Sequence, residues 1–98
     1  EGHVISRVFG DRQPAVSSIK AVTGHALGAS GAIEALTCAL AVQRAALPPN
    51  LGLGVQDPEI PLADIVRTSR TWAPGYAISN SFGFGGTNAS LVLGRVSG

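Results

Sequence analysis

The sequence contains no methionine, only one cysteine and few charged residues. A single cysteine excludes an internal disulfide and a cysteine-based zinc cluster, and it is typical of a reducing, cytoplasmic compartment. The net charge of +1 provides no basic patch, which argues against nucleic acid as a partner. Because methionine is absent, we expect that residue 1 is not the natural start of the protein.

Long hydrophobic runs are also missing. The nearest, residues 32–42, is interrupted by Glu34 and falls short of the roughly 18 residues that predict a membrane span. Hydrophobic residues nevertheless make up 45% of the chain and charged residues only 13%. A chain of 98 residues buries a modest fraction of its surface. We therefore expect part of its apolar surface to pack against polypeptide outside these residues.

The hydrophobic pattern predicts an α/β chain in the order helix, strand, helix, loop and two strands. The expected ranges are 2–9, 15–19, 31–46, 50–75, 76–79 and 89–93. The long middle helix is apolar on nearly all sides, which predicts a buried central position, and Ser30 is placed to cap it. The last two strands are close enough in sequence to form an antiparallel pair.

Three polar residues stand out against this apolar background. His25 lies in a glycine-rich turn, where a neutral imidazole can donate a hydrogen bond to a developing oxyanion or merely satisfy a loop carbonyl. Glu34 lies on a helix with almost no other polar side chain, and a buried carboxylate needs a counter-charge. Lys20, at the end of the expected strand, or a bound cation can supply that charge.

Other candidates are weaker. Cys38 lies in the middle of the apolar helix and is expected to be a packing residue, since reactive thiolates favour helix starts or positive neighbours. His3 is expected on the surface. The glycines at 24–31 match neither dinucleotide-binding nor phosphate-binding loops, and no zinc motif is present. The glycines among Phe82 and Phe84 indicate either a loop that admits a substrate or a tight turn between strands.

Taken together, these motifs resemble the carboxy-terminal part of the β-ketoacyl-acyl-carrier-protein synthases, condensing enzymes of the thiolase superfamily. The resemblance extends over almost the whole chain and is closest to the elongating synthases of fatty acid biosynthesis. The matching segments, in order, are 8–11, 17–20, Thr23-Gly24-His25, 28–35, Pro48-Pro49-Asn50 and Asn80–Asn88.

The resemblance implies a partial thiolase-like fold, in which residues 1–98 form the end of the second half of a layered αβαβα architecture. A mixed sheet would accompany a buried central helix. By matching motif, His25 would be the second catalytic histidine, Lys20 the lysine of the active site and Glu34 its associated acid.

The same resemblance assigns further residues. Phe84 would match the gating phenylalanine, and Phe82 and Gly85 would contact substrate with it. In some members the glutamate joins residues matching Ser79 and Asn80 around a structural monovalent cation, and no other cofactor is required.

The implied reaction is a decarboxylative condensation of an acyl thioester with malonyl-acyl carrier protein. Acyl carrier protein, the amino-terminal part of the same synthase and a second copy of the parent would be partners. The family's nucleophilic cysteine and first histidine should lie upstream of residue 1, so we expect the isolated chain to be inactive. Two alternatives are a catalytically silent chain-length-determining partner and a freestanding module that binds acyl chains or carrier protein.

Overall fold

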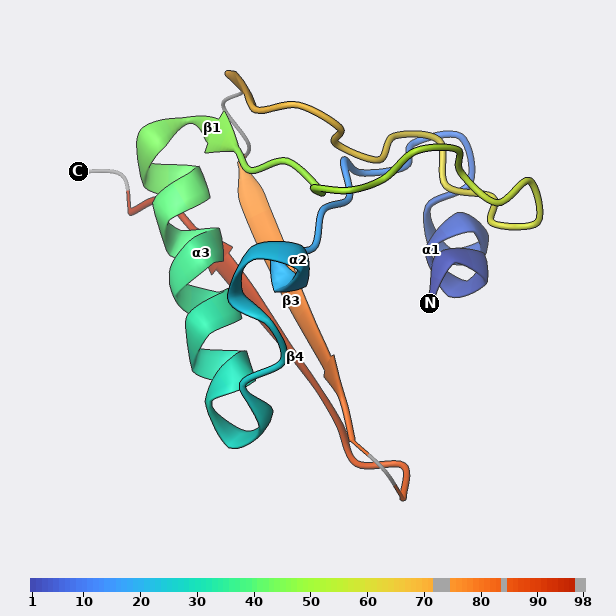
Figure 1. The fold of residues 1–98 in the computed structure, drawn as a ribbon. Helices are drawn as coiled ribbons and strands as arrows, with labels where there is room; N and C mark the ends of the chain where they lie inside the picture. Colours follow the sequence, from blue (N-terminus) through green and yellow to red (C-terminus); the bar gives the residue numbers. More distant parts are fainter. Residues whose placement is uncertain (72–74, 84, 97–98) are drawn as a thin grey trace.

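The computed structural model describes residues 1–71, 75–83 and 85–96 (Figure 1). The chain combines helices and strands, as expected for an α/β chain, although the strand expected between the first two helices is not formed. In order, the elements are α1 (Gly2–Phe9), α2 (Lys20–Thr23), the 3-10 turn η1 (Leu27–Ala29), α3 (Ser30–Arg44), β1 (Ala46–Leu47), β2 (Arg70–Thr71), β3 (Tyr76–Phe82) and β4 (Asn88–Gly94).

Helix α3 lies along the hairpin that β3 and β4 form (Figure 1). The two strands pair antiparallel, in a register that runs from Tyr76 opposite Gly94 to Phe82 opposite Asn88. The predicted antiparallel pair is therefore confirmed, and each strand is longer than expected. Alternation of apolar and polar residues favours such a half-covered strand pair.

The prediction of one mixed sheet is wrong for the described residues. Strands β1 and β2 form a separate antiparallel pair, and the parallel contact is an isolated bridge between Val16 and Ile65. The strand expected at 15–19 is reduced to this bridge, because its partner segment follows it for only one residue. Lys20 consequently begins α2 instead of ending a strand.

Helix α3 has the expected length but not the expected burial. Val42 is its one fully buried residue among those described, and Leu36 is 61% exposed. The helix contacts the hairpin on one side, and no described element covers the other. Within this chain, the prediction of a buried central helix is therefore wrong, since a helix is buried only where something packs on it.

The segment from 50 to 66 crosses back to the amino-terminal part of the chain. Gln13 holds it at two points, donating to the carbonyl of Pro61 at 3.2 Å and accepting from the N–H of Ala63 at 3.0 Å. Val66, which is 2% exposed, donates its N–H to the carbonyl of Val16 at 2.9 Å. The predicted irregular crossing is confirmed, and these bonds attach it beside α1 (Figure 1).

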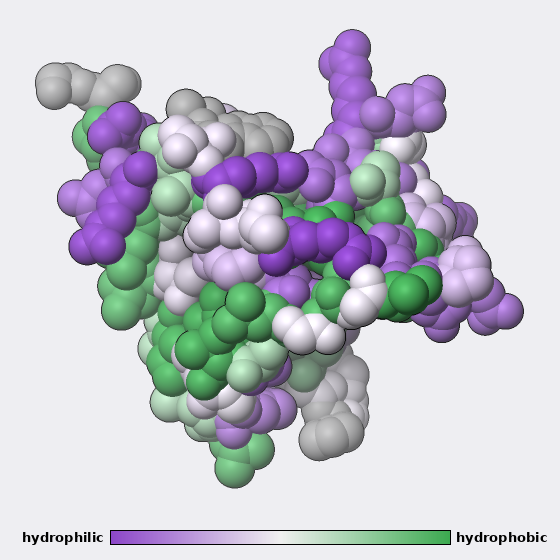
Figure 2. Space-filling model, turned by 45° about the horizontal axis from the view of Figure 1, so that its top comes forward, coloured by the Kyte–Doolittle hydropathy of each residue, from purple (hydrophilic) through white to green (hydrophobic). Residues whose placement is uncertain are grey.

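The chain exposes more surface than its mass predicts. Its accessible area is 7105 Å², whereas a compact protein of 9.9 kDa exposes roughly 5,200 Å². Figure 2 shows apolar side chains gathered on the exposed face rather than hidden beneath polar ones. The exposed apolar residues include Val4, Val8, Leu36, Leu91 and Val92. None of the helices described has the length and apolar character needed to cross a membrane.

Candidate active site

Lys20 and Glu34 form an ion pair between α2 and α3. The Lys20 Nζ donates to the Glu34 Oε2, and the two side chains are 43% and 20% exposed. Glu34 projects from a largely apolar helix, so an ammonium partner stabilises a carboxylate that is partly removed from water. The predicted pairing is confirmed, while a catalytic role for either residue remains a prediction.

His25 is held through one of its two ring nitrogens. The backbone N–H of Leu27 donates to the Nδ1 of His25 at 3.0 Å, and the Ser30 Oγ lies 3.0 Å from the same nitrogen. A backbone N–H can only donate, so Nδ1 must carry a lone pair. In the neutral imidazole the proton then lies on Nε2, which makes Nε2 a hydrogen-bond donor.

The turn that places the Leu27 N–H is conformationally unusual. Gly24 has a φ of 71° and Leu27 a φ of 52°. Glycine adopts positive φ without penalty, whereas a leucine there carries roughly 1–2 kcal/mol of strain. The Leu27 side chain is 78% exposed, so packing of that side chain does not explain the conformation. The bond from its N–H to His25 is one contact that this backbone makes possible.

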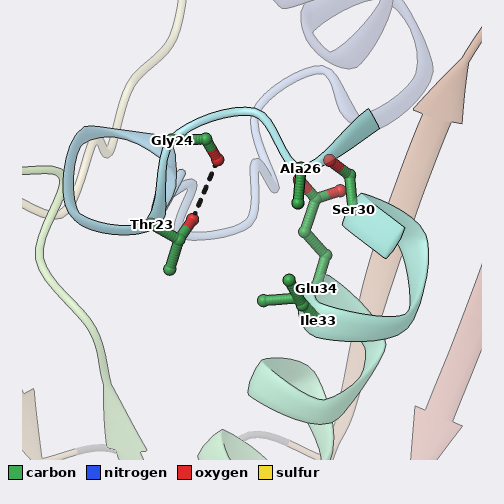
Figure 3. Close-up of a pocket in the computed structure, with 6 residues that line it drawn as sticks. All are labelled: Thr23, Gly24, Ala26, Ser30, Ile33 and Glu34. Carbon is green, nitrogen blue, oxygen red and sulfur yellow. Dashed lines mark hydrogen bonds between the residues drawn. The ribbon is translucent and has the colours of Figure 1, made fainter. Parts of the chain in front are cut away.

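A shallow hollow lies beside this turn (Figure 3). Figure 3 shows the Glu34 carboxylate reaching from α3 toward Ala26 and Ser30. The Thr23 hydroxyl, on the opposite side, lies within hydrogen-bond distance of the carbonyls of Ile19 and Gly24, at 3.3 and 3.1 Å. The hollow is open to solvent, so these residues form a wall of a site rather than a closed cavity.

The second glycine motif forms the hairpin loop between β3 and β4. The Gly83 N–H donates to the carbonyl of Thr87 at 2.7 Å, and Gly85 and Gly86 have φ values of 88° and 86°. Phe82 ends β3 and is 61% exposed. Phe84 lies outside the described residues. The motif thus connects the two strands, but the exposed Phe82 is not the core residue that a purely structural turn would require. Substrate binding by Phe82, Phe84 and Gly85 remains a prediction.

The residues expected around a monovalent cation are oxygen donors of a suitable kind. However, the Asn80 side chain donates to the Glu1 Oε1 at 3.2 Å and accepts from the Ser90 hydroxyl at 2.7 Å. Glu34 is paired with Lys20, and Ser79 is buried within β3. No described hydrogen bond joins these three side chains to one another, and a cation site formed by them remains a prediction. The described part of the chain also brings together no group of three His, Cys, Asp or Glu residues able to hold a metal ion.

Cys38 is half-buried in α3. Burial, and secondarily the negative charge of Glu34, raise the pKa of its thiol above the ordinary value of 9.0. A thiol that stays protonated is a poor nucleophile, which agrees with its predicted packing role. His3 is exposed on α1, as expected.

Two groups that contact His25 were not assigned this role from the sequence. The backbone N–H of Leu27 carries no signal in a residue pattern. Ser30 was expected to cap α3, but Ala29 holds the N-cap position and Ser30 is the first residue of the helix. Its position five residues after His25 was the available signal.

Comparison with known proteins agrees with this description. The model of the family described as "Beta-ketoacyl synthase, C-terminal domain" matches residues 1–54. The 3-oxoacyl-(acyl-carrier-protein) synthase 2 of Mycobacterium tuberculosis is 42% identical over 95 residues, which cover 97% of this chain and 23% of that protein. The chain thus spans about a quarter of the length of the curated relatives it matches.

Solved structures give the same likeness. The ishigamide ketosynthase/chain length factor superposes with a TM-score of 0.92 at 32% identity, covering 99% of this chain and 24% of the other. A type II PKS ketosynthase, solved with its acyl-carrier protein and bound to the hexaketide, gives a TM-score of 0.90 at 28% identity, with 98% and 24% covered. These likenesses confirm the predicted thiolase-like α/β fold.

Proposed function

Because the chain belongs to the β-ketoacyl synthase family, we propose that it forms the carboxy-terminal part of a condensing active site. The proposed reaction joins an acyl thioester to malonyl-acyl carrier protein, with loss of carbon dioxide, in fatty acid biosynthesis. The observation that carries the proposal is the hydrogen bond from the Leu27 N–H to the Nδ1 of His25, since it leaves Nε2–H as a donor.

The chemistry needs such a donor. When the malonyl carboxylate leaves as carbon dioxide, the electron pair of the breaking carbon–carbon bond forms an enolate on the thioester. An Nε2–H from His25 would stabilise the enolate oxygen in a site shielded from water. The enolate carbon then attacks the acyl thioester, and the thiolate that held the acyl group departs.

Lys20 and Glu34 would set the charge around this donor. Their ion pair joins α2 to α3 on the two sides of the turn that carries His25. Removing either charge would disturb both the local field and the position of the turn. We assign them positioning roles, because the contact described for each side chain is with the other.

The acyl nucleophile would come from polypeptide outside this chain, as would the first histidine. Cys38 is unsuited to the role, because burial favours its protonated form. We expect the isolated 98 residues to be inactive. The exposed apolar surface would pack against the amino-terminal part of the same synthase, in a parent that forms a homodimer.

The proposed carrier-protein partner has support from one structural relative. That ketosynthase was solved in complex with its acyl-carrier protein. For this chain, acyl- and malonyl-loaded carrier proteins are the corresponding proposal. No organic cofactor is required for the reaction, and a structural monovalent cation remains a prediction.

The test uses His25→Ala in the full-length synthase, with His3→Ala as the matched control. We expect malonyl decarboxylation to fall by about 10²–10³-fold, the usual cost of removing one oxyanion donor. Acylation of the upstream cysteine should stay largely intact, and His3→Ala should leave both steps unchanged. Equal loss of acylation and decarboxylation in His25→Ala would make His25 structural and reject the proposal.

A catalytically silent chain-length partner is the second candidate, because one structural neighbour is a ketosynthase/chain length factor. The ion pair and the oriented histidine favour the catalytic assignment, since a silent partner has no enolate to stabilise. A full-length protein without decarboxylase activity, which restores activity when mixed with an active synthase, would favour the silent partner. Cooperative, monomeric folding and carrier binding by the isolated chain would instead favour a freestanding module.

A further inference from the structure

We propose that Ser30 is a positioning residue for His25. Its hydroxyl would donate to Nδ1 and, with the Leu27 N–H, hold the ring so that Nε2–H faces the reacting thioester. The inference rests on the proposed function of His25 and goes beyond it, because it assigns a second residue that fixes the ring's orientation.

The first observation is the arrangement around Nδ1. The Leu27 nitrogen and the Ser30 oxygen each lie 3.0 Å from it. The backbone N–H donates, so Nδ1 has no proton to give to Ser30. A hydroxyl can either donate or accept, and beside an unprotonated nitrogen it must donate. Ser30 and Leu27 therefore share one acceptor.

The second observation is what Ser30 does not do. A serine at the N-cap position of a helix usually accepts a hydrogen bond from a backbone N–H of the first turn. Here α3 begins at Ser30 with Ala29 as its N-cap and without a side-chain capping bond. The Ser30 hydroxyl is directed to His25 instead, and the residue is only half-buried, so filling space does not account for it.

The two donors come from different elements. Leu27 belongs to the turn η1, whereas Ser30 begins the helix that packs on the hairpin. Rotation about the last side-chain bond of a histidine is broad and roughly two-fold, so a single hydrogen bond restricts it weakly. A flipped ring would turn a carbon toward both donors and leave both unpaired. Ser30 thus adds an anchor on α3 to the one on the turn.

The experiment compares Ser30→Ala, Ser30→Cys and Ser30→Thr in the full-length synthase. We expect Ser30→Ala to lower the kcat of malonyl decarboxylation about five- to tenfold, the change that corresponds to one hydrogen bond. The KM for malonyl-acyl carrier protein should stay unchanged. Ser30→Cys keeps the size but donates weakly and should behave like Ala, whereas Ser30→Thr keeps the hydroxyl and should restore activity.

A spectroscopic readout separates positioning from general damage. In protein labelled with ¹⁵N-histidine, the His25 Nδ1 should show the shift of a hydrogen-bonded, unprotonated nitrogen. Ser30→Ala should move that resonance, and Ser30→Thr should return it. Ser69→Ala is the matched control, because the Ser69 hydroxyl contacts the carbonyl of Leu47 and not His25.

The outcomes separate this inference from the proposed function. If His25→Ala loses decarboxylation while Ser30→Ala keeps wild-type kcat and an unmoved Nδ1 resonance, the Ser30 assignment is rejected and the proposed function stands. If His25→Ala retains decarboxylation, the proposed function itself is rejected. If Ser30→Ala fails to fold, a loss of activity in folded Ser30→Cys with recovery in Ser30→Thr supports the assignment. Equal activity of the Cys and Thr variants overturns it.

Discussion

The Lys20 ammonium and the Glu34 carboxylate lie fourteen residues apart and form the ion pair that joins α2 to α3. His25 and its two donors lie on the chain between them. The pair therefore brackets the turn on which the proposed chemistry depends. Since both side chains retain contact with water, solvent screens the pair and its contribution to stability is small.

Removing either member of the pair should impair the reaction, and removing both should do little more harm. We expect Lys20→Met and Glu34→Gln each to lower the kcat of malonyl decarboxylation in the full-length synthase. In the double variant the second substitution removes a group whose partner is already gone, so the effects should not add. Asp64→Asn, which breaks the Arg70 ion pair elsewhere, is the control. Additive losses would show that the two residues act independently.

Gly94 should resist substitution. A Cβ at this position would lie 2.8 Å from two ring atoms of Tyr76, its partner across the hairpin. We expect Gly94→Ala to speed amide hydrogen exchange in β3 and β4, corresponding to a loss of about 1 kcal/mol of local stability.

The matched control for Gly94 is Gly54→Ala, where the added Cβ has no atom within 4 Å. Tyr76→Ala in the Gly94→Ala background should recover part of the protection by removing the ring. Equal exchange in Gly94→Ala and Gly54→Ala would contradict the steric argument.

Leu27 should tolerate glycine better than valine. Glycine removes the strain of the positive φ but increases the freedom of the unfolded chain, so Leu27→Gly should change stability little. Valine is β-branched and fits the left-handed region poorly, so Leu27→Val should destabilise the protein by about 1 kcal/mol or more relative to Leu27→Gly. Urea unfolding of the full-length variants measures the difference. Equal midpoints would mean that Leu27 is not strained.

Cys38 should react slowly with iodoacetamide in the folded protein. Burial and the charge of Glu34 raise the pKa of its thiol, so little thiolate exists near neutral pH. Peptide-resolved mass spectrometry distinguishes it from other cysteines of the full-length protein. Glu34→Gln removes the nearby negative charge and should accelerate alkylation of Cys38. Because the thiol stays half-buried, the rate should remain below that of the urea-unfolded protein. An unchanged alkylation rate in Glu34→Gln would contradict the contribution of the Glu34 charge to the raised pKa of the Cys38 thiol.

The raised pKa of the Cys38 thiol also makes the stability of the folded protein depend on pH. The folded-state pKa lies above the unfolded value of 9.0, so folding favours the protonated thiol. This contribution is fully present below about pH 9 and is lost as the pH rises through the folded-state pKa. Cys38→Ala should therefore show a weaker decline in unfolding free energy above pH 9 than the wild-type protein. Parallel declines would show that Cys38 does not titrate during unfolding.

The hairpin and the ion pair were predictable because their signals are local or chemically compelling. Two strand-forming runs on either side of a glycine-rich turn favour a strand pair, and a lone carboxylate on a largely apolar helix requires a cation. The bridge between Val16 and Ile65 was harder to predict from the sequence, since it joins two segments that lie far apart along the chain.

The burial of α3 was overestimated for a different reason. The apolar residues of the helix indicate that its surface can be buried. They do not indicate whether the segments that would bury it belong to the same 98 residues. The role of Ser30 was also obscured, because a serine at a helix start has a common local explanation. In the folded chain its hydroxyl lies beside His25, a contact that this helix-start pattern does not predict.

Both hydrogen bonds described for His25 come from residues within five positions of it. The orientation of the imidazole is thus encoded in a single short stretch rather than assembled from distant strands. No distant strand is needed to set these two donors against the imidazole. Substitutions in the β3–β4 hairpin are accordingly expected to leave the orientation of the imidazole unchanged.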